Sequence, residues 1–288
     1  MEAFFASGAL VLTSAFLFGL LIGSFLNVVI LRLPAWMEWR WKADSRDLLG
    51  LPAEPAEPKP PGVVMERSHC PRCGHKLAWW ENVPLLSFAL LRGRCRGCGV
   101  AISWQYPIIE LLTGLTFVVV VWRLGIGVEG IAALVFTAFL IGMSGIDLRT
   151  TLLPDGMTLP LLWLGLLLAA LGWLQPPETA IVGAVVGYLS LWSVYWLFKL
   201  LTGKEGMGYG DFKLLAAIGA WCGWQAILPV LLMSSLIGAV VGGTWLALRG
   251  RDRATPIPFG PFLAGAGWVQ LVFAPDLLGG YLRVSGLG

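Results

Sequence analysis

The sequence predicts an all-α, polytopic membrane protein with about eight transmembrane helices and a zinc-binding cytoplasmic insertion. Three observations support this fold class. Of the 288 residues, 57% are hydrophobic and only 13% are charged, whereas about a quarter are charged in soluble domains. Apolar runs of about twenty residues recur along the chain, and the mean hydropathy is +0.77. Four cysteines form two CxxC pairs inside the most highly charged stretch, residues 32–102.

The apolar runs give the expected membrane spans. They cover residues 8–31, 103–122, 127–146, 154–174, 179–201, 211–224, 226–248 and 258–279. The first run lacks a basic start and a small-residue cleavage site, so we interpret it as a helix and not as a signal peptide. The expected domains are a first helix in 1–31, an insertion in 32–102 and a seven-helix membrane domain in 103–288.

Lysine and arginine positions predict the orientation. If the N-terminus lies outside the cytoplasm, all but two of the 20 cations (Arg123 and Arg283) fall on the cytoplasmic side. The net charge of +3 then reflects topology, and we expect the partner of this chain to be the lipid bilayer and no nucleic acid.

The insertion begins with residues 34–50, which mix three tryptophans with arginine and lysine. This composition suits a helix lying in the headgroup region, where indole rings and cations are both stable, or an ordinary amphipathic loop.

The two CxxC pairs, "CPRCGH" and "CRGCGV", are the strongest local signal. Each pair is followed by glycine, and 21 residues separate Cys73 from Cys95. Such knuckles bring two thiolates each to one ion, so Cys70, Cys73, Cys95 and Cys98 predict a tetrahedral, structural Zn²⁺ site with no open position. Two disulfides or a redox motif are the alternatives, but disulfides are rare in the cytosol.

Ionisable groups at the membrane are costly and therefore need an explanation. Asp155 follows Pro154 and is well placed to cap the fourth span. Glu110 needs a polar partner that the sequence does not identify. Asp147 and Asp211 belong to different spans that reach the same cytoplasmic face, so their carboxylates can converge and share one proton. That arrangement is typical of aspartic proteases: one carboxylate takes a proton from water and the protonated one polarises the scissile carbonyl.

Three alternating glycines precede the second aspartate in "GKEGMGYGDFKLLA". Without side chains at Gly206, Gly208 and Gly210, a substrate strand could approach the carboxylate and pair with exposed backbone. A flexible loop with Asp211 as a helix cap is the competing interpretation.

Together these residues resemble the type IV prepilin peptidases, a family of Gly-x-Gly-Asp aspartic proteases. The resemblance runs nearly the whole length and includes "GSFLNVVILRLP", the paired knuckles, "PIIELLTG", "DLRTTLLPD", "GKEGMGYGDFKLLAAIGAW" and "PIPFGP". It implies that Asp147 and Asp211 are the catalytic pair. It also implies a location in the bacterial inner membrane, with a periplasmic N-terminus and an active site facing the cytoplasm.

The family cleaves the leaders of type IV prepilins and type II secretion pseudopilins. Many members with the cysteine-bearing insertion also N-methylate the new terminus with S-adenosylmethionine, which the resemblance implies as a cofactor here. The sequence has no glycine-rich Rossmann motif that would locate this methyl donor.

Three other functions fit parts of the sequence. A cation-coupled transporter would use intramembrane acids, but it leaves the CxxC pairs unexplained. A structural component of a secretion machine would use the insertion for docking. A related membrane aspartic protease with other substrates would share the aspartates without needing the cysteines.

Overall fold

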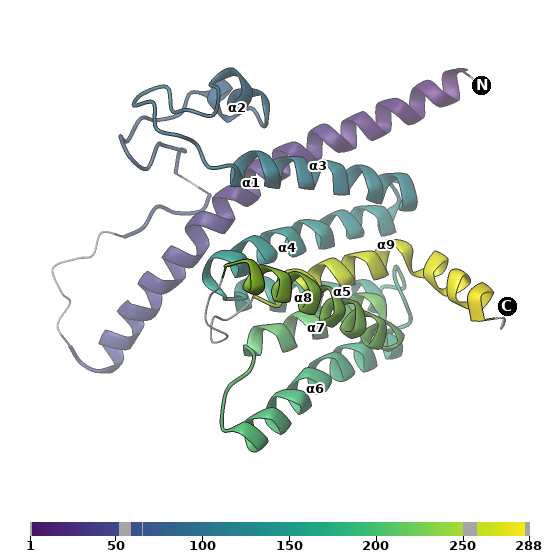
Figure 1. Ribbon diagram of the computed structural model, residues 1–288. Coiled ribbons are helices and arrows are strands. Elements are labelled where there is room, and N and C mark those ends of the chain that lie inside the picture. Colours follow the sequence, from purple (N-terminus) through teal and green to yellow (C-terminus); the bar gives the residue numbers. More distant parts are fainter. Residues whose placement is uncertain (1, 52–58, 65, 250–257, 286–288) are drawn as a thin grey trace. The chain divides into compact units, whose positions relative to one another are not determined.

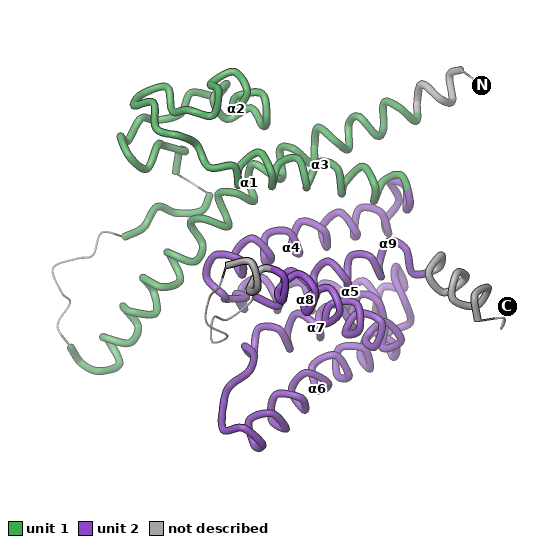
Figure 2. Tube along the Cα trace, in the orientation of Figure 1, with its two compact units in different colours: residues 1–122 green, residues 123–288 purple. Residues whose placement is uncertain are grey.

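The computed structural model describes residues 2–51, 59–64, 66–249 and 258–285 (Figure 1). The described residues contain no named strand, and the all-α fold class is confirmed. The chain divides into two compact units, residues 1–122 and 123–288, coloured separately in Figure 2.

Unit 1 contains α1 (Glu2–Leu48), a 3-10 turn (Trp79–Asn82), the short α2 (Leu86–Leu90) and most of α3 (Gln105–Leu124). Helices α1 and α3 approach closely because both carry glycine where they meet. A Cβ atom on Gly19 would lie 2.8 Å from the Cα of Gly114, and one on Gly23 would lie 2.7 Å from the Cα of Glu110. Small residues spaced four apart are typical of helix pairs packed inside membranes.

Helix α1 continues well beyond the span expected to end at residue 31. Its 47 residues include Pro34, which does not end it. At 1.5 Å per residue the helix is about 70 Å long, so roughly half of it must lie outside a hydrocarbon core about 30 Å thick. Arg40 lies over the ring of Trp36 at 5.4 Å, within this extension. Of the two interpretations of residues 34–50, the structure therefore supports a helix up to Leu48.

Unit 2 contains α4 (Val128–Thr150), α5 (Asp155–Ala170), α6 (Pro177–Thr202), α7 (Tyr209–Cys222), α8 (Ile227–Arg249) and α9 (Gly260–Ser285). Helix α7 packs against α5, α6 and α9, and ten of its 14 residues are buried. Its contact with α6 is closest at two glycines: a Cβ atom on Gly183 would lie 2.2 Å from the carbonyl oxygen of Gly219. At its far end, the Trp221 indole N–H donates to the Leu161 carbonyl of α5 at 2.8 Å.

Five of the described helices are long and apolar enough to cross a bilayer, and Asp155–Ala170 and Gly260–Ala274 are shorter apolar helices. The chain is therefore a multi-pass membrane protein. Helix α7 has only 14 residues, about 21 Å of helix, which is shorter than the hydrocarbon core. The total of eight spans thus stays a prediction.

Candidate active site and metal cluster

The four predicted cysteines converge in unit 1. Their sulfur atoms all lie within 4.8 Å of one another, and all four thiols are free. The Sγ atoms of Cys70 and Cys98 are 3.9 Å apart, as are those of Cys73 and Cys95. The cluster could hold a metal ion, and four converging thiolates suit a tetrahedral structural site.

The two knuckles repeat the same backbone pattern 25 residues apart. Gly74 N–H donates to the Cys70 carbonyl and Gly99 N–H to the Cys95 carbonyl, at 2.9 and 2.8 Å. These two glycines have φ angles of +70° and +71°, which other residues rarely adopt. Backbone N–H groups of Cys73 and Arg72 lower the pKa of the Cys70 thiol to about 6, which favours the thiolate that metal binding requires.

A buried carboxylate supports the first knuckle from outside. Glu81 accepts the Ala78 N–H at 2.7 Å, and its Oε2 lies 3.1 Å from His75 Nε2. The Ala78 N–H, together with His75, lowers the pKa of Glu81. His75 also packs beside Gly97 of the second knuckle, where an added Cβ would lie 3.1 Å from the His75 Cβ. His75 thus braces the two knuckles, and its Nε2 faces Glu81.

Two polar side chains of α1, both within the motif "GSFLNVVILRLP", hold the insertion and the start of α3 in place. Arg32 donates to the carbonyls of Gly62 and Glu66 at 2.8 and 3.0 Å. Asn27 is buried and donates to the Tyr106 carbonyl at 3.1 Å. These hydrogen bonds join α1 to residues 62–66 of the insertion and to the start of α3.

Glu110 has a backbone partner that sequence reasoning could not identify. Its carboxylate is buried and accepts the Leu85 N–H at 2.8 Å. Leu85 has a φ angle of +58°, so Glu110 holds a strained turn of the insertion against α3.

The two aspartates of the predicted pair lie together in unit 2. Asp147 is in the last turn of α4 and Asp211 is in the first turn of α7. Both side chains are buried, with relative exposures of 5% and 8%, and the two carboxylates interact electrostatically. Two buried like charges at close range cannot both form cheaply, so the pair is suited to holding one shared proton.

A third residue, which sequence reasoning missed, touches this pair. Gly260, the first residue of α9, donates its backbone N–H to Asp147 Oδ2 at 2.9 Å. Gly260 lies in the motif "PIPFGP", whose first two residues are outside the described part of the chain. The motif indicated resemblance, but nothing in its letters indicated this hydrogen bond.

The three loop glycines have different surroundings. An added Cβ on Gly206 would lie 3.0 Å from the Phe198 ring, and one on Gly210 would lie 2.7 Å from the Leu153 Cβ. Gly208 is open, with its nearest neighbour at 4.0 Å. Close packing thus accounts for Gly206 and Gly210, and Gly208 offers the bare backbone that the sequence predicted for all three.

Asp155 does not cap α5 as expected. Pro154 occupies the cap position without a side-chain hydrogen bond, and Asp155 is the first helical residue. Its Oδ1 lies 2.6 Å from Lys213 Nζ of α7, two residues beyond Asp211. The capping expectation is wrong because an ion pair between α5 and α7 takes up this carboxylate.

An aromatic cluster anchors the loop that leads to Asp211. Lys199 of α6 pairs with Glu205 at 2.8 Å and donates to the Tyr195 hydroxyl at 3.3 Å. The Tyr195 ring in turn packs against Tyr209 and Phe212, with centroids 5.3 and 5.7 Å away. These contacts hold Glu205 within residues 203–208 and Tyr209 directly after them, two residues before Asp211.

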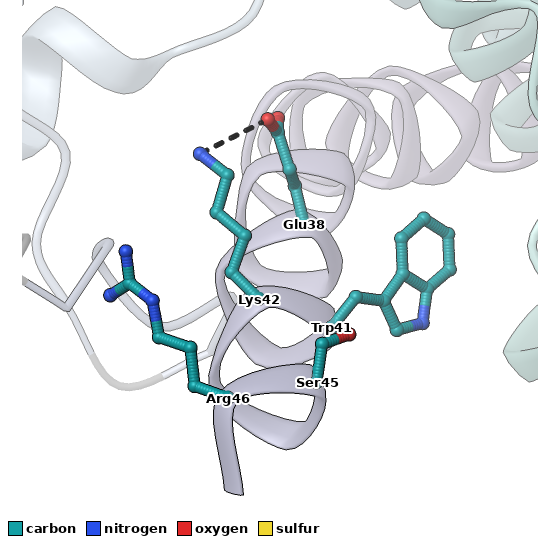
Figure 3. A pocket seen from close by; sticks show the side chains of 5 residues that line it. All are labelled: Glu38, Trp41, Lys42, Ser45 and Arg46. Carbon is teal, nitrogen blue, oxygen red and sulfur yellow. Dashed lines mark ion pairs between the residues drawn. The ribbon is translucent and has the colours of Figure 1, made fainter. Parts of the chain in front are cut away.

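A hollow on the extension of α1 is lined by Glu38, Trp41, Lys42, Ser45 and Arg46 (Figure 3). Lys42 and Glu38 form an ion pair at 3.4 Å, and their side chains are 49% and 67% exposed. Exposed pairs of this spacing contribute only a few tenths of a kcal/mol. We therefore interpret this hollow as solvated helix surface and assign no chemistry to it.

Comparison with known proteins gives matches over most of the chain. The bacterial peptidase A24 N-terminal domain matches residues 17–124, and the type IV leader peptidase family matches residues 134–243. A relative from Xanthomonas campestris pv. campestris is 61% identical over 93% of both chains. A relative from Pseudomonas aeruginosa is 52% identical over 94% of this chain and 93% of its own. One from Aeromonas salmonicida is 53% identical over 93% and 92%.

Each of these relatives is named a prepilin leader peptidase/N-methyltransferase. No solved structure shows a significant match. The matches favour the peptidase hypothesis over a transporter or a structural component.

Proposed function

The chain belongs to the type IV leader peptidase family, and from this membership we propose that it is a membrane aspartic endopeptidase. Its substrates are the leader peptides of type IV prepilins and of type II secretion pseudopilins. It also N-methylates the new N-terminal residue, as the names of its relatives indicate. The observation that supports the peptidase activity most directly is the buried, interacting pair of Asp147 and Asp211.

In the proposed cleavage, the pair carries one proton. The ionised carboxylate takes a proton from a water molecule, whose oxygen attacks the scissile carbonyl carbon. The protonated carboxylate donates a hydrogen bond, and then its proton, to the carbonyl oxygen. When the tetrahedral intermediate collapses, the C–N bond breaks and the leaving amine takes a proton from the pair. One hydroxyl of the intermediate returns its proton to the pair as the carboxyl product forms, so the pair again holds one proton. The open backbone at Gly208 is where an extended substrate would lie.

We assign Zn²⁺ to Cys70, Cys73, Cys95 and Cys98. Four convergent sulfur ligands fit this ion and leave no position for a substrate, so its role is structural. S-adenosylmethionine supplies the methyl group when bound, and we assign no residue to it.

The proposed location is the inner membrane, with the N-terminus in the periplasm and the aspartates near the cytoplasmic face. The distribution of lysine and arginine supports this orientation, since only Arg123 and Arg283 would lie outside.

The test is the N-terminal mass of a prepilin that is co-expressed with the enzyme. Wild-type protein should remove the leader and add one methyl group, about 14 Da. Asp147→Asn and Asp211→Asn keep the side-chain size but remove the ionisable group, so each should abolish cleavage while the protein still accumulates. Glu129→Gln, an exposed carboxylate in the first turn of α4, is the matched control and should cleave normally. Substantial cleavage by either aspartate variant would refute the assignment.

A further inference from the structure

The start of α9 lies directly against one carboxylate of the pair. Gly260 is buried, and its N–H donates to Asp147 Oδ2 at 2.9 Å although the two residues are 113 positions apart. Helix α9 packs along α4, and the Trp268 indole N–H donates to the Thr137 hydroxyl at 3.0 Å further along the two helices. The donor is therefore held at a defined place relative to Asp147.

The space around this hydrogen bond admits only glycine. A Cβ atom on Gly260 would lie 2.7 Å from Asp147 Oδ2 and 3.2 Å from Leu153 Cδ1. The same leucine fills the space beside Gly210, where an added Cβ would lie 2.7 Å from the Leu153 Cβ. Leu153 thus separates the donor at Gly260 from the residue that precedes Asp211. A side chain at Gly260 could be accommodated only by moving the carboxylate or this leucine.

The charged groups around Asp147 show why the Gly260 N–H matters for the ionised form of this carboxylate. Asp211 of α7 interacts electrostatically with it, and the Asp211 backbone N–H donates to the Gly208 carbonyl at 3.2 Å. Among the described residues of α5 and α7, Asp155 and Lys213 are paired with each other, and the described side chains of α9 carry no charge. Arg149 of α4 is exposed. Asp147 also lies at the C-terminal end of α4, where the helix dipole disfavours an anion.

We propose that Gly260 is a positioning residue for peptide cleavage. Its backbone N–H orients the Asp147 carboxylate and stabilises its ionised form, and the absence of a side chain keeps that carboxylate in reach of Asp211. A hydrogen bond from the first N–H of a helix to a carboxylate combines a strong donor with the positive end of the helix dipole. This hydrogen bond offsets the unfavourable effect of the α4 dipole on an ionised Asp147. The inference rests on the catalytic role proposed above for Asp147.

Two changes at Gly260 separate the steric and the hydrogen-bonding parts of this role. Gly260→Ala keeps the N–H but displaces the carboxylate, and we expect kcat for prepilin cleavage to fall about 100-fold. KM should change little, because Gly260 is buried and contacts the Asp147 carboxylate. Gly265→Ala is the matched control on the same helix, since Gly265 is exposed and an added Cβ would meet nothing within 4 Å. Its kcat should equal that of the wild type.

The second change replaces Gly260 with glycolic acid by nonsense suppression, which exchanges the N–H for an ester oxygen and adds no bulk. The limbs of the pH–rate profile report ionisation of the coupled pair. At least one of them should then move to higher pH by about one to two units, the equivalent of a hydrogen bond to a charged group. A merely structural role would lower the amount of folded protein and leave the limbs where they are.

The outcomes distinguish this inference from the function on which it rests. If Asp147→Asn protein cleaves prepilin, the proposed catalytic pair is wrong. If that variant is inactive but Gly260→Ala matches Gly265→Ala, or the ester variant shows no movement of either limb to higher pH, then Gly260 has no positioning role.

Discussion

Replacing Glu110 with alanine should loosen the cysteine-bearing insertion while leaving unit 2 unchanged. The buried carboxylate accepts the Leu85 N–H at 2.8 Å and holds a residue with a φ angle of +58°. Without this acceptor the N–H loses its partner and the strained turn loses its restraint. The turn at residues 83–91 should therefore open more often.

The expected loss of free energy follows from the hydrogen bond between the Leu85 N–H and the Glu110 carboxylate. A hydrogen bond to a charged group contributes about 1.5–3 kcal/mol. The variant also removes the cost of burying a carboxylate with a relative exposure of 7%, so the lower end of that range applies. A change of about 1.5 kcal/mol corresponds to an opening equilibrium that is about tenfold more favourable. Glu110→Gln keeps a neutral acceptor and should lie between the wild type and the alanine variant.

Hydrogen exchange followed by mass spectrometry measures this opening locally. In Glu110→Ala protein, amides of residues 83–91 should exchange about tenfold faster, while peptides from α7 exchange as before. Glu38→Ala is the matched control, because Glu38 is an exposed carboxylate of the same unit with one ion pair along its own helix. If the Glu110 variant exchanges no faster than this control, the carboxylate does not hold the insertion.

Three further predictions follow from other contacts. Cys70→Ser should remove the metal, so elemental analysis should fall from about one zinc per chain to none; a wild-type protein without metal would contradict the site. Lys213→Met breaks a partly exposed ion pair with Asp155, so the free energy of unfolding should fall by no more than about 1 kcal/mol. A larger loss would show that the pair is better shielded from solvent than its exposure indicates. Gly183→Ala places a Cβ atom 2.2 Å from the Gly219 carbonyl oxygen, so the free energy of unfolding should fall by at least about 1–3 kcal/mol. Thermal unfolding measures this loss, and an unchanged transition would mean that α6 and α7 separate easily.

Most of what the sequence could predict depended on hydropathy and on the identity of a few side chains. Burial in lipid requires apolar runs, so the all-helical membrane class followed from composition alone. The two CxxC pairs predicted a cluster because each knuckle is a local structure, complete within about six residues. The convergence of Asp147 and Asp211 needed only the rule that alternate helix ends share one face. These features depend on short stretches of chain or on the membrane, and neither requires knowledge of tertiary packing.

Some local rules failed where tertiary contacts compete with them. Proline usually ends or kinks a helix, yet α1 passes through Pro34 to Leu48. An aspartate after a proline at a helix start suggests a cap, yet Asp155 pairs with Lys213 across 58 residues. Nothing in the letters around Asp155 indicates that a lysine from α7 will lie 2.6 Å away. Such pairings depend on how α5 and α7 pack.

The partners of the buried carboxylates were beyond sequence reasoning for a further reason. Glu110 and Asp147 each accept a backbone N–H, from Leu85 and Gly260 respectively. Every residue except proline has that donor, so no residue type marks the partner. What the sequence can record is the space around the donor, and at Gly260 that space excludes even a methyl group. The φ angle of Gly260 does not require glycine, and the residue is buried at a helix start. Glycine at such a position is therefore evidence that another group, here the Asp147 carboxylate, approaches the backbone closely. This reasoning extends to Gly210, whose added Cβ would meet Leu153. Two glycines that differ in sequence context thus preserve the spacing of the same carboxylate pair.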